Sequence, residues 1–174
     1  MTGIHPVYRT PQGLADDLRT RLLEEGNAIL GTVNPDGSPH LTELLFSLDE
    51  HDRVHLPTPH ATRKVKNVQA RPVATFFVSL DGGGWVSCTG PARVIMGQDA
   101  ARINEGIRER LLTEAGLATI GLLLAAHEDT TIEITPAKWL SWNSAEIMPG
   151  IIEVGGDIEA YPPDTWFKDL KTED

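Results

Sequence analysis

The sequence predicts a mainly β domain with α-helices, in which antiparallel strands form a small closed barrel. Apolar segments of strand length follow one another, and turns that contain Gly, Pro or Asp separate most of them. The expected order is helix, three strands, short helix, two strands, helix and strand, which gives six strands with flanking helices. Mostly antiparallel strands joined by tight turns, with helices inserted, are typical of such a barrel.

The first part of the chain predicts one helix and three strands. Leucines recur at helical spacing from Leu14 to Leu22, and Gly26 ends the run. The segment 34–37, Asn-Pro-Asp-Gly, predicts a turn, because proline fits its first corner and glycine the position that needs positive φ. A second turn is expected at 49–52. The strands are therefore expected at 28–33, 40–48 and 54–58.

The middle of the chain predicts a short helix and a long hairpin. The helix covers 62–71, and the nearly continuous apolar run 73–80 is typical of a central strand covered on both faces. The segment 81–84 predicts a hairpin turn into a strand over 85–95. Gly90-Pro91 interrupts that strand, which predicts a bulge or bend of the kind that helps a barrel to close.

The last part of the chain predicts a helix and one strand. Ile103, Ile107 and Leu111 mark a helix between Gln98 and Ala115. The apolar segment 117–126 receives no assignment. The last strand is expected over 130–143, and the tryptophans near its end, Trp139 and Trp142, are expected in the core or at an interface.

The chain is expected to form one domain with short extensions. Its 174 residues suffice for a single hydrophobic core. We expect a loose N-terminal arm at 1–13, the domain itself at 14–144, and a tail at 145–174. The aromatic residues of the tail indicate that it packs on the barrel or on a partner subunit.

Composition excludes several classes of protein. The net charge of −10 argues against non-specific binding to nucleic acid, which needs a basic face. No apolar run is long enough to cross a bilayer, and the N-terminus lacks the pattern of a signal peptide, so we expect a cytoplasmic protein. The single cysteine, Cys88, is interpreted as a small buried strand residue in a reducing compartment.

The start of the short helix is the strongest functional signal. It combines the hydroxyl of Thr62 with the cations of Arg63 and Lys64, just after the strand that ends at Thr58. Helix starts favour phosphate through unpaired N–H donors and the positive end of the helix dipole. Arginine adds forked donors and lysine adds a point charge. Beside a barrel of strands, this pattern predicts a site for a phosphorylated cofactor.

No residues with the spacing of a catalytic or metal-binding motif accompany this signal. His51, His55 and His60 lack the spacing of a helical metal pair or a structural zinc site, so no metal is expected. There is no nucleophile-elbow motif, Cys–His arrangement or paired-carboxylate motif. Glu43 is interpreted as a residue at the rim of the site and not as a base, and no catalytic residue is assigned.

The order of elements and three short motifs resemble the split-barrel flavoproteins similar to pyridoxamine 5'-phosphate oxidase. The motifs are the turn 34–40, the group formed by Thr58 with 62–64, and the segment 90–95 at the end of the fifth strand. The resemblance covers roughly residues 14–143. It implies a six-stranded split barrel and a homodimer with two flavin sites at the subunit interface.

The resemblance also implies which residues bind the cofactor. Arg63 and Lys64 would hold the phosphate with help from Thr62 and Thr58, and the segment 42–47 would line the isoalloxazine, while Trp85 would reach the flavin of the other subunit. The implied cofactor-binding residues are Thr42, Glu43, Leu44, Leu45, Ser47, Pro57, Thr58, Thr62, Arg63, Lys64 and Trp85.

The chain differs from the oxidase that gives the family its name. Its end, 165–171, lacks the arginine-bearing segment with which that oxidase grips its phosphorylated substrate, so pyridoxal phosphate synthesis is not expected. The compact form is similar to short actinobacterial members, many of which use the deazaflavin coenzyme F-420 in place of FMN. The resemblance leaves FMN and coenzyme F-420 as alternatives.

Three hypotheses for function follow. The first is a flavin- or deazaflavin-dependent oxidoreductase that transfers hydride between the cofactor and a small, conjugated organic acceptor. The second is a non-catalytic protein of the same fold that binds or carries a flavin, a deazaflavin or a tetrapyrrole. The third is a structural barrel dimer without a ligand. The sequence does not identify the substrate.

Overall fold

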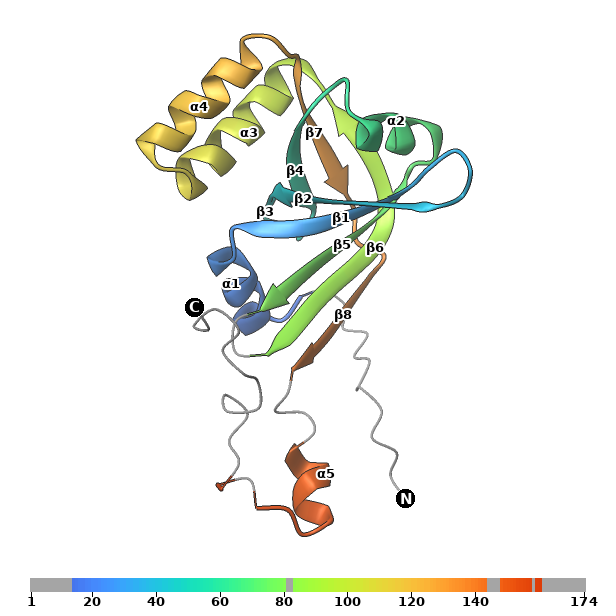
Figure 1. Cartoon of the computed structure of the whole chain (residues 1–174), viewed down its shortest axis with the longest axis vertical. Coiled ribbons are helices and arrows are strands. Elements are labelled where there is room, and N and C mark those ends of the chain that lie inside the picture. Colours follow the sequence, from blue (N-terminus) through green and yellow to red (C-terminus); the bar gives the residue numbers. More distant parts are fainter. Residues whose placement is uncertain (1–13, 81–82, 144–147, 158, 161–174) are drawn as a thin grey trace, which may run out of the picture.

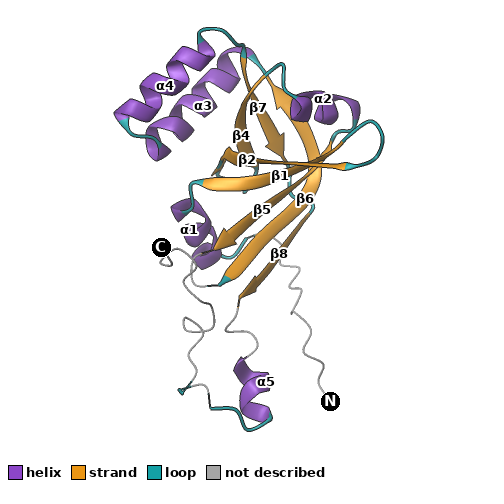
Figure 2. Ribbon diagram, in the orientation of Figure 1, coloured by secondary structure: helices purple, strands orange, loops and turns teal. Residues whose placement is uncertain are grey.

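The fold is an antiparallel sheet with α1, α2 and α3 packed on it and α5 apart from it (Figure 1, Figure 2). The computed structural model describes residues 14–80, 83–143, 148–157 and 159–160. The expected arm at 1–13 and most of the tail at 145–174 lie outside these ranges. The described helices are α1 (Asp16–Glu24), α2 (Arg63–Ala70), α3 (Gly97–Leu111), α4 (Glu114–Leu124) and α5 (Met148–Glu153).

The described strands number eight, so the expected count of six is wrong. The strands expected at 40–48 and 130–143 are each divided, the first at Phe46 and the second at 135–137. The strands are β1 (Asn27–Val33), β2 (Pro39–Leu45), β3 (Ser47–Leu48), β4 (Val54–Pro59), β5 (Val73–Leu80), β6 (Gly84–Ile95), β7 (Asp129–Ile134) and β8 (Lys138–Asn143).

The sheet is split and not closed. Its order is β2-β1-β5-β6-β7-β4-β3, with β8 added on β6, and all neighbours are antiparallel. The strands β2 and β4 approach each other without a backbone ladder between them. The chain breaks here at Phe46, whose ring is fully buried and whose carbonyl accepts a hydrogen bond of 2.7 Å from Arg110. Burial of this ring turns the chain out of β2 before it can pair with β4.

The bend predicted at Gly90-Pro91 is where β6 changes partners. Up to Thr89 the strand pairs with β8, and from Ala92 it pairs with β7. The link between β7 and β8 crosses directly over Gly90, where a Cβ atom would lie 2.0 Å from the carbonyl oxygen of Thr135. Only glycine permits this close approach of two backbones.

The core is a single cluster inside the curved sheet. Phe76 lies at its centre, in edge contact with Phe46 at 5.0 Å and with Trp139 at 6.1 Å between ring centroids. Cys88 belongs to this cluster, and burial raises the pKa of its thiol to about 12. The thiol is therefore protonated at neutral pH, in agreement with its interpretation as a structural residue.

The helices differ in how firmly they are held. Asn104 of α3 is fully buried and bonds β7 at both ends of its amide, through the carbonyl of Thr130 at 3.0 Å and the hydroxyl of Thr131 at 2.6 Å. The unassigned segment 117–126 belongs largely to α4, which lies beside α3 (Figure 1). No residue of α4 is buried.

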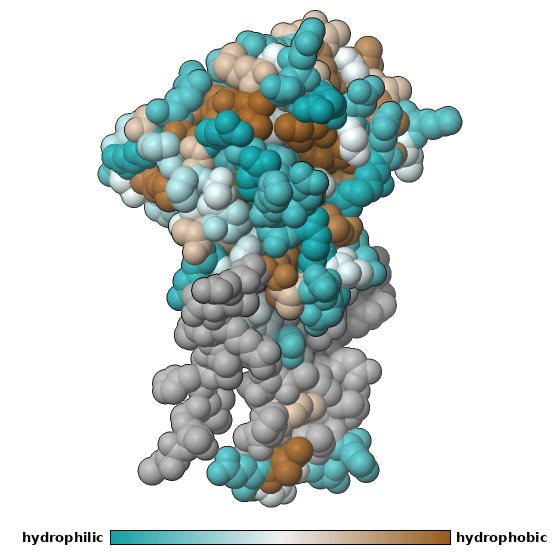
Figure 3. All heavy atoms as spheres, turned by 180° about the vertical axis from the view of Figure 1, so that it is seen from behind, coloured by the Kyte–Doolittle hydropathy of each residue, from teal (hydrophilic) through white to brown (hydrophobic). Residues whose placement is uncertain are grey.

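The surface combines polar areas with local apolar patches. On the face seen from behind, hydrophobic side chains gather in the upper part of the molecule, where α2, α3 and α4 lie (Figure 3). Among the described residues, no helix has both the length and the apolar character that a membrane crossing requires.

A buried carboxylate joins three neighbouring strands at one side of the sheet. Glu133 of β7 is 4% exposed and contacts His55 at 3.0 Å and Arg93 at 2.6 Å, with Arg53 at 3.6 Å. Burial alone would raise the pKa of Glu133, but the hydrogen bonds from Arg93 and His55 and the nearby charges of Arg93 and Arg53 outweigh it and lower this pKa. The negative form is therefore the stable one, and the cluster stabilises the fold.

We predict that Gly90→Ala destabilises the protein by about 3 kcal/mol or more, because the added Cβ atom meets backbone on the facing segment. Gly106→Ala is the matched control, since nothing lies within 4 Å of a Cβ atom there. That control is expected to gain up to about 1 kcal/mol as a helix-interior Gly-to-Ala change. Urea unfolding of both variants measures the difference, and equal stabilities would contradict this assignment.

We predict that Glu133→Gln costs about 1–3 kcal/mol of stability at neutral pH, since a buried charged hydrogen-bond acceptor is lost. The folded-state pKa of Glu133 is lowered, so its contribution is present above the ordinary glutamate pKa and is lost as pH falls through the lowered value. The difference in free energy of unfolding between wild type and the variant should therefore become smaller in acid. Glu105→Gln, an exposed change on α3, should show no such pH-dependent gap in thermal unfolding.

Candidate functional site

The split in the sheet forms a slot between β2 and β4. The short β3 pairs only with His55 and Val54, so the rest of that edge of β4 has no strand beside it. Backbone N–H groups alternate sides along a strand, and the N–H of His60 donates to Glu128 on the β7 side. The N positions of Pro57 and Pro59 therefore face the slot, where proline has no N–H to leave unpaired. The edge of β4 at Pro57 and Pro59 therefore leaves no backbone N–H group unpaired in the slot.

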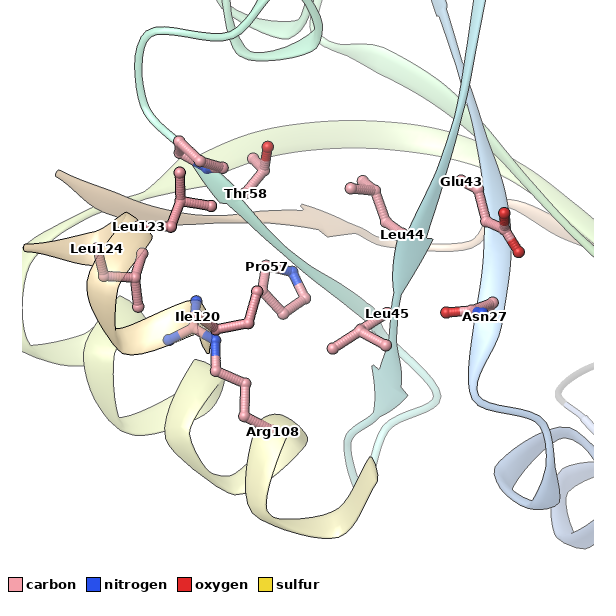
Figure 4. A pocket seen from close by; sticks show the side chains of 11 residues that line it. Asn27, Glu43, Leu44, Leu45, Pro57, Thr58, Arg108, Ile120, Leu123 and Leu124 are labelled. Atoms are coloured by element: carbon pink, nitrogen blue, oxygen red, sulfur yellow. The ribbon is translucent and has the colours of Figure 1, made fainter. Parts of the chain in front are cut away.

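A pocket of about 340 Å³ occupies this slot and extends under α4 (Figure 4). Its volume lies at the lower end of the range for small-molecule sites. One wall comes from the strands and the other from the helices α3 and α4. The lining residues are Asn27, Glu43, Leu44, Leu45, Pro57, Thr58, Pro59, Arg108, Ile120, Leu123 and Leu124.

The start of α2 lies directly after the strand wall. Thr62 occupies the N-cap position, but its side chain makes no cap hydrogen bond and instead approaches the hydroxyl of Thr58 at 3.4 Å. The hydroxyl of Thr62 is therefore at the expected cap position, but it does not satisfy a backbone donor of the helix. The N–H groups of the first turn are left without a side-chain cap, and such groups favour an anion.

The two cations at this helix start have different surroundings. Arg63 is exposed and lines a second depression, of about 470 Å³, with His40 and the turn residue Asp36. Lys64 is half-buried, and burial lowers the pKa of its amine. Lys64 makes no ion pair within the part of the chain that the structure describes. A half-buried cation without a partner is a group that an anionic ligand would stabilise.

The position of α2 is fixed by the turn between β1 and β2. Asn67 is buried and donates to the hydroxyl of Thr32 and to the side chain of Asn34, both at 3.1 Å. Arg71, which follows α2, donates to the carbonyls of Asn34 at 2.8 Å and Pro35 at 3.2 Å. The turn predicted from the sequence thus holds the C-terminal half of α2 in place.

Three buried side-chain atoms have no hydrogen-bond partner within the described residues, and one of them is Oδ1 of Asn143 on β8. The other two belong to residues next in sequence to the pocket lining, namely Oγ1 of Thr42 on β2 and Nδ1 of His60 on the link between β4 and α2. Buried polar atoms in native proteins are nearly always satisfied. These two atoms therefore fit a polar ligand or a partner chain that would complete the site.

The structure brings together most, but not all, of the residues proposed to bind a cofactor. Glu43, Leu44, Leu45, Pro57 and Thr58 line the pocket, and Glu43 is exposed at its rim. Thr42, Thr62, Arg63 and Lys64 lie on β2 and at the start of α2.

Ser47 and Trp85 do not line this pocket. Ser47 pairs with His55 in the short β3, away from the slot. Trp85 lies half-buried on β6, stacked on Phe77 at 6.0 Å between ring centroids and in register with Trp142 of β8. Within one subunit, Trp85 belongs to a face of the sheet and not to the pocket.

Sequence reasoning missed the helix wall of the pocket. Arg108 is followed at 120–124 by a continuous apolar run, in which Ile120, Leu123 and Leu124 face the slot. Arg108 lies on α3 and the apolar residues lie on α4, and no sequence motif links them. Only the folded arrangement of α3 and α4 brings these residues to the strand wall.

The fold defines the class of a split-barrel protein with a pocket at the split. A family model described as pyridoxamine 5'-phosphate oxidase matches residues 14–143, and the chain belongs to this family. A curated relative, 30% identical over 97 residues, is a biliverdin reductase of Mycobacterium tuberculosis that depends on the reduced form of coenzyme F-420. The match covers 55% of this chain and 70% of that relative.

Solved structures agree with the fold. A conserved hypothetical protein from Mycobacterium tuberculosis superposes with a TM-score of 0.60 at 19% identity, over 78% of this chain and 89% of that chain. A structure titled as an F-420 reductase gives a TM-score of 0.57, also at 19% identity, over 72% of this chain and 98% of that one. At identities this low, the superpositions show the common split-barrel fold alone. Together with the family match and the curated relative, they make the chain similar to the family members named for coenzyme F-420.

Proposed function

We propose that this protein is an oxidoreductase that binds a phosphorylated flavin or deazaflavin in the slot between β2 and β4. The observation that carries the proposal is that the strand wall of an apolar pocket ends at Pro59 and that an uncapped, cationic helix start follows it at 62–64. A ring system bearing a phosphate on a flexible chain needs both features side by side. When bound, such a cofactor supplies hydride chemistry, which explains why the chain needs no catalytic motif of its own.

The residues present fit this cofactor. The first turn of α2, Arg63 and Lys64 would bind the phosphate, and Thr58 and Thr62 offer hydroxyls beside it. The apolar wall of Leu44, Leu45 and Pro57 would exclude water from the ring. The unpartnered hydroxyl of Thr42 would find an acceptor or donor there.

We infer that two subunits complete the site. On one face of the sheet, Leu41 and Ile29 are 64% and 41% exposed, and the stacked pair of Phe77 and Trp85 lies on the neighbouring strands. An exposed aliphatic and aromatic stripe of this kind favours association. In a homodimer built on this face, Trp85 would approach the pocket of the other subunit, the role implied by the family resemblance.

Of the two cofactors, we propose coenzyme F-420. The support is the biliverdin reductase relative, whose name specifies the reduced form of this coenzyme. The acceptor would be a small, conjugated organic molecule, as the apolar pocket favours. The protein would act in the cytoplasm as a soluble homodimer.

We predict that Arg63→Ala combined with Lys64→Ala weakens cofactor binding at least tenfold and leaves the fold intact. Each charged hydrogen bond to phosphate contributes on the order of 1.5–3 kcal/mol, and both side chains lie at the surface or half-buried. The control is Arg102→Ala with Lys138→Ala, which removes the same charge from exposed positions outside the pocket. Titration of each purified variant with F-420 and with FMN, followed by absorbance, would refute the phosphate site if the two double variants bind equally well.

We predict turnover as well as binding. Bound, reduced coenzyme F-420 should be reoxidised by a conjugated acceptor at least tenfold faster than the free coenzyme under the same conditions. Stopped-flow absorbance at the deazaflavin band measures both rates, with the Arg63→Ala and Lys64→Ala double variant as control. Tight binding with no acceleration by any acceptor would instead identify a carrier protein.

A further inference from the structure

The helix α4 leaves an apolar surface without cover. Its sequence, 114–124, contains one charged residue, Glu114, and none of its residues is buried. Leu122 and Leu123 are 78% and 45% exposed. Exposed apolar surface of this kind in a folded chain marks a place where another apolar body binds.

The two sides of α4 differ. Ile120, Leu123 and Leu124 line the pocket and face the strand wall across it, as Figure 4 shows. Leu122 is not among the lining residues. The inner side therefore forms the wall of the pocket opposite to the strands, whereas Leu122 points away from it.

Arg108 places a cation beside this apolar wall. It extends from α3 with its guanidinium toward Ile120 and Pro57 (Figure 4), and its side chain is 13% exposed. Nη2 contacts both carboxylate oxygens of Asp129, at 2.9 and 2.8 Å, so Asp129 fixes the orientation of the group. The guanidinium has five N–H donors. Those on Nε and Nη1 are not used by Asp129 and can serve a ligand.

The charges around Arg108 limit where an anion can bind. The other charged residue of the pocket, Glu43, lies at the far end beside Asn27 (Figure 4). The neighbouring groove between α3 and α4, of about 540 Å³, is lined by Glu105 and Glu109 as well as by Asp129. An anionic group is therefore favoured on the pocket side of Arg108 and disfavoured in the groove.

We propose that Arg108 and the inner side of α4 (Ile120, Leu123 and Leu124) form the acceptor side of the pocket. They select a flat, apolar, conjugated molecule that carries a carboxylate. This assignment rests on the proposed function, in which the cofactor ring lies along the strand wall. The second reactant then lies along the helix wall. Arg108 acts as a specificity-determining residue, because it pairs with the carboxylate and not with the reacting atoms.

The test uses the full chain and two fluorescent probes that differ only in charge, anthracene-9-carboxylate and anthracene-9-carboxamide. Fluorescence anisotropy measures their affinities. Ile120→Ala combined with Leu123→Ala should weaken binding of both probes at least tenfold. Leu122→Ala, a change of the same kind on the outer side of the same helix, should alter binding less than twofold. Equal effects of the two changes would overturn the assignment of the inner side.

Arg108 is tested by the preference between the probes. Wild type should bind the carboxylate at least fivefold more tightly than the carboxamide. Arg108→Gln with Asp129→Asn should abolish this preference while keeping affinity for the carboxamide, and the paired change avoids leaving Asp129 without its partner. Arg108→Lys, which keeps a cation at this position, should show a preference between that of wild type and that of the double variant. Circular dichroism checks folding, and an unchanged preference in the double variant would overturn the role of Arg108.

Saturating coenzyme F-420 separates this inference from the proposed function. Probe binding that persists with the cofactor present supports the acceptor side, and displacement of the probe by the cofactor overturns it. Failure of the proposed function would give a different result. Neither F-420 nor FMN would bind, although the substitutions in α4 and at Arg108 would still change the affinities of the probes.

Discussion

The missing backbone ladder between β2 and β4 determines what this sheet can bind. A free strand edge invites pairing with other chains unless something blocks it. Here Pro57 and Pro59 remove the donors that would face the opening, and α4 lies across from it. The split is therefore a stable feature of the unliganded chain. It leaves a slot with an apolar interior beside the packed core.

The charged groups around Glu133 and those at the start of α2 differ in whether they have partners within the chain. Glu133 is paired within the chain with His55, Arg53 and Arg93, and removing one partner of a buried pair of this kind destabilises the fold. Within the described part of the chain, Lys64 at the start of α2 is half-buried without an ion pair, and the Thr42 hydroxyl on β2 is buried without a hydrogen bond. Groups left unsatisfied in this way fit a ligand. This contrast supports the proposal that the anion site lies at the start of α2.

The sequence predicted the parts of the fold that local chemistry specifies. The turn at 34–37 was predicted because proline and glycine restrict its backbone, and Gly37 has a φ of 90°. Gly90-Pro91 was predicted as a bend for the same reason. The break at Phe46 was not predicted, because it depends on burial of a ring in the core and no Gly or Pro marks it. The helix α4 was missed because its uniformly apolar sequence shows no periodicity, and Arg108 because only packing brings it to the slot.

A crystal structure of the protein with coenzyme F-420 bound tests the central claim most directly. The account predicts the cofactor phosphate within hydrogen-bond distance of the first-turn N–H groups of α2 and of Arg63. It also predicts the ring between β2 and β4. A ring bound elsewhere, such as in the polar depression beside Glu133 and Arg93, would contradict the account.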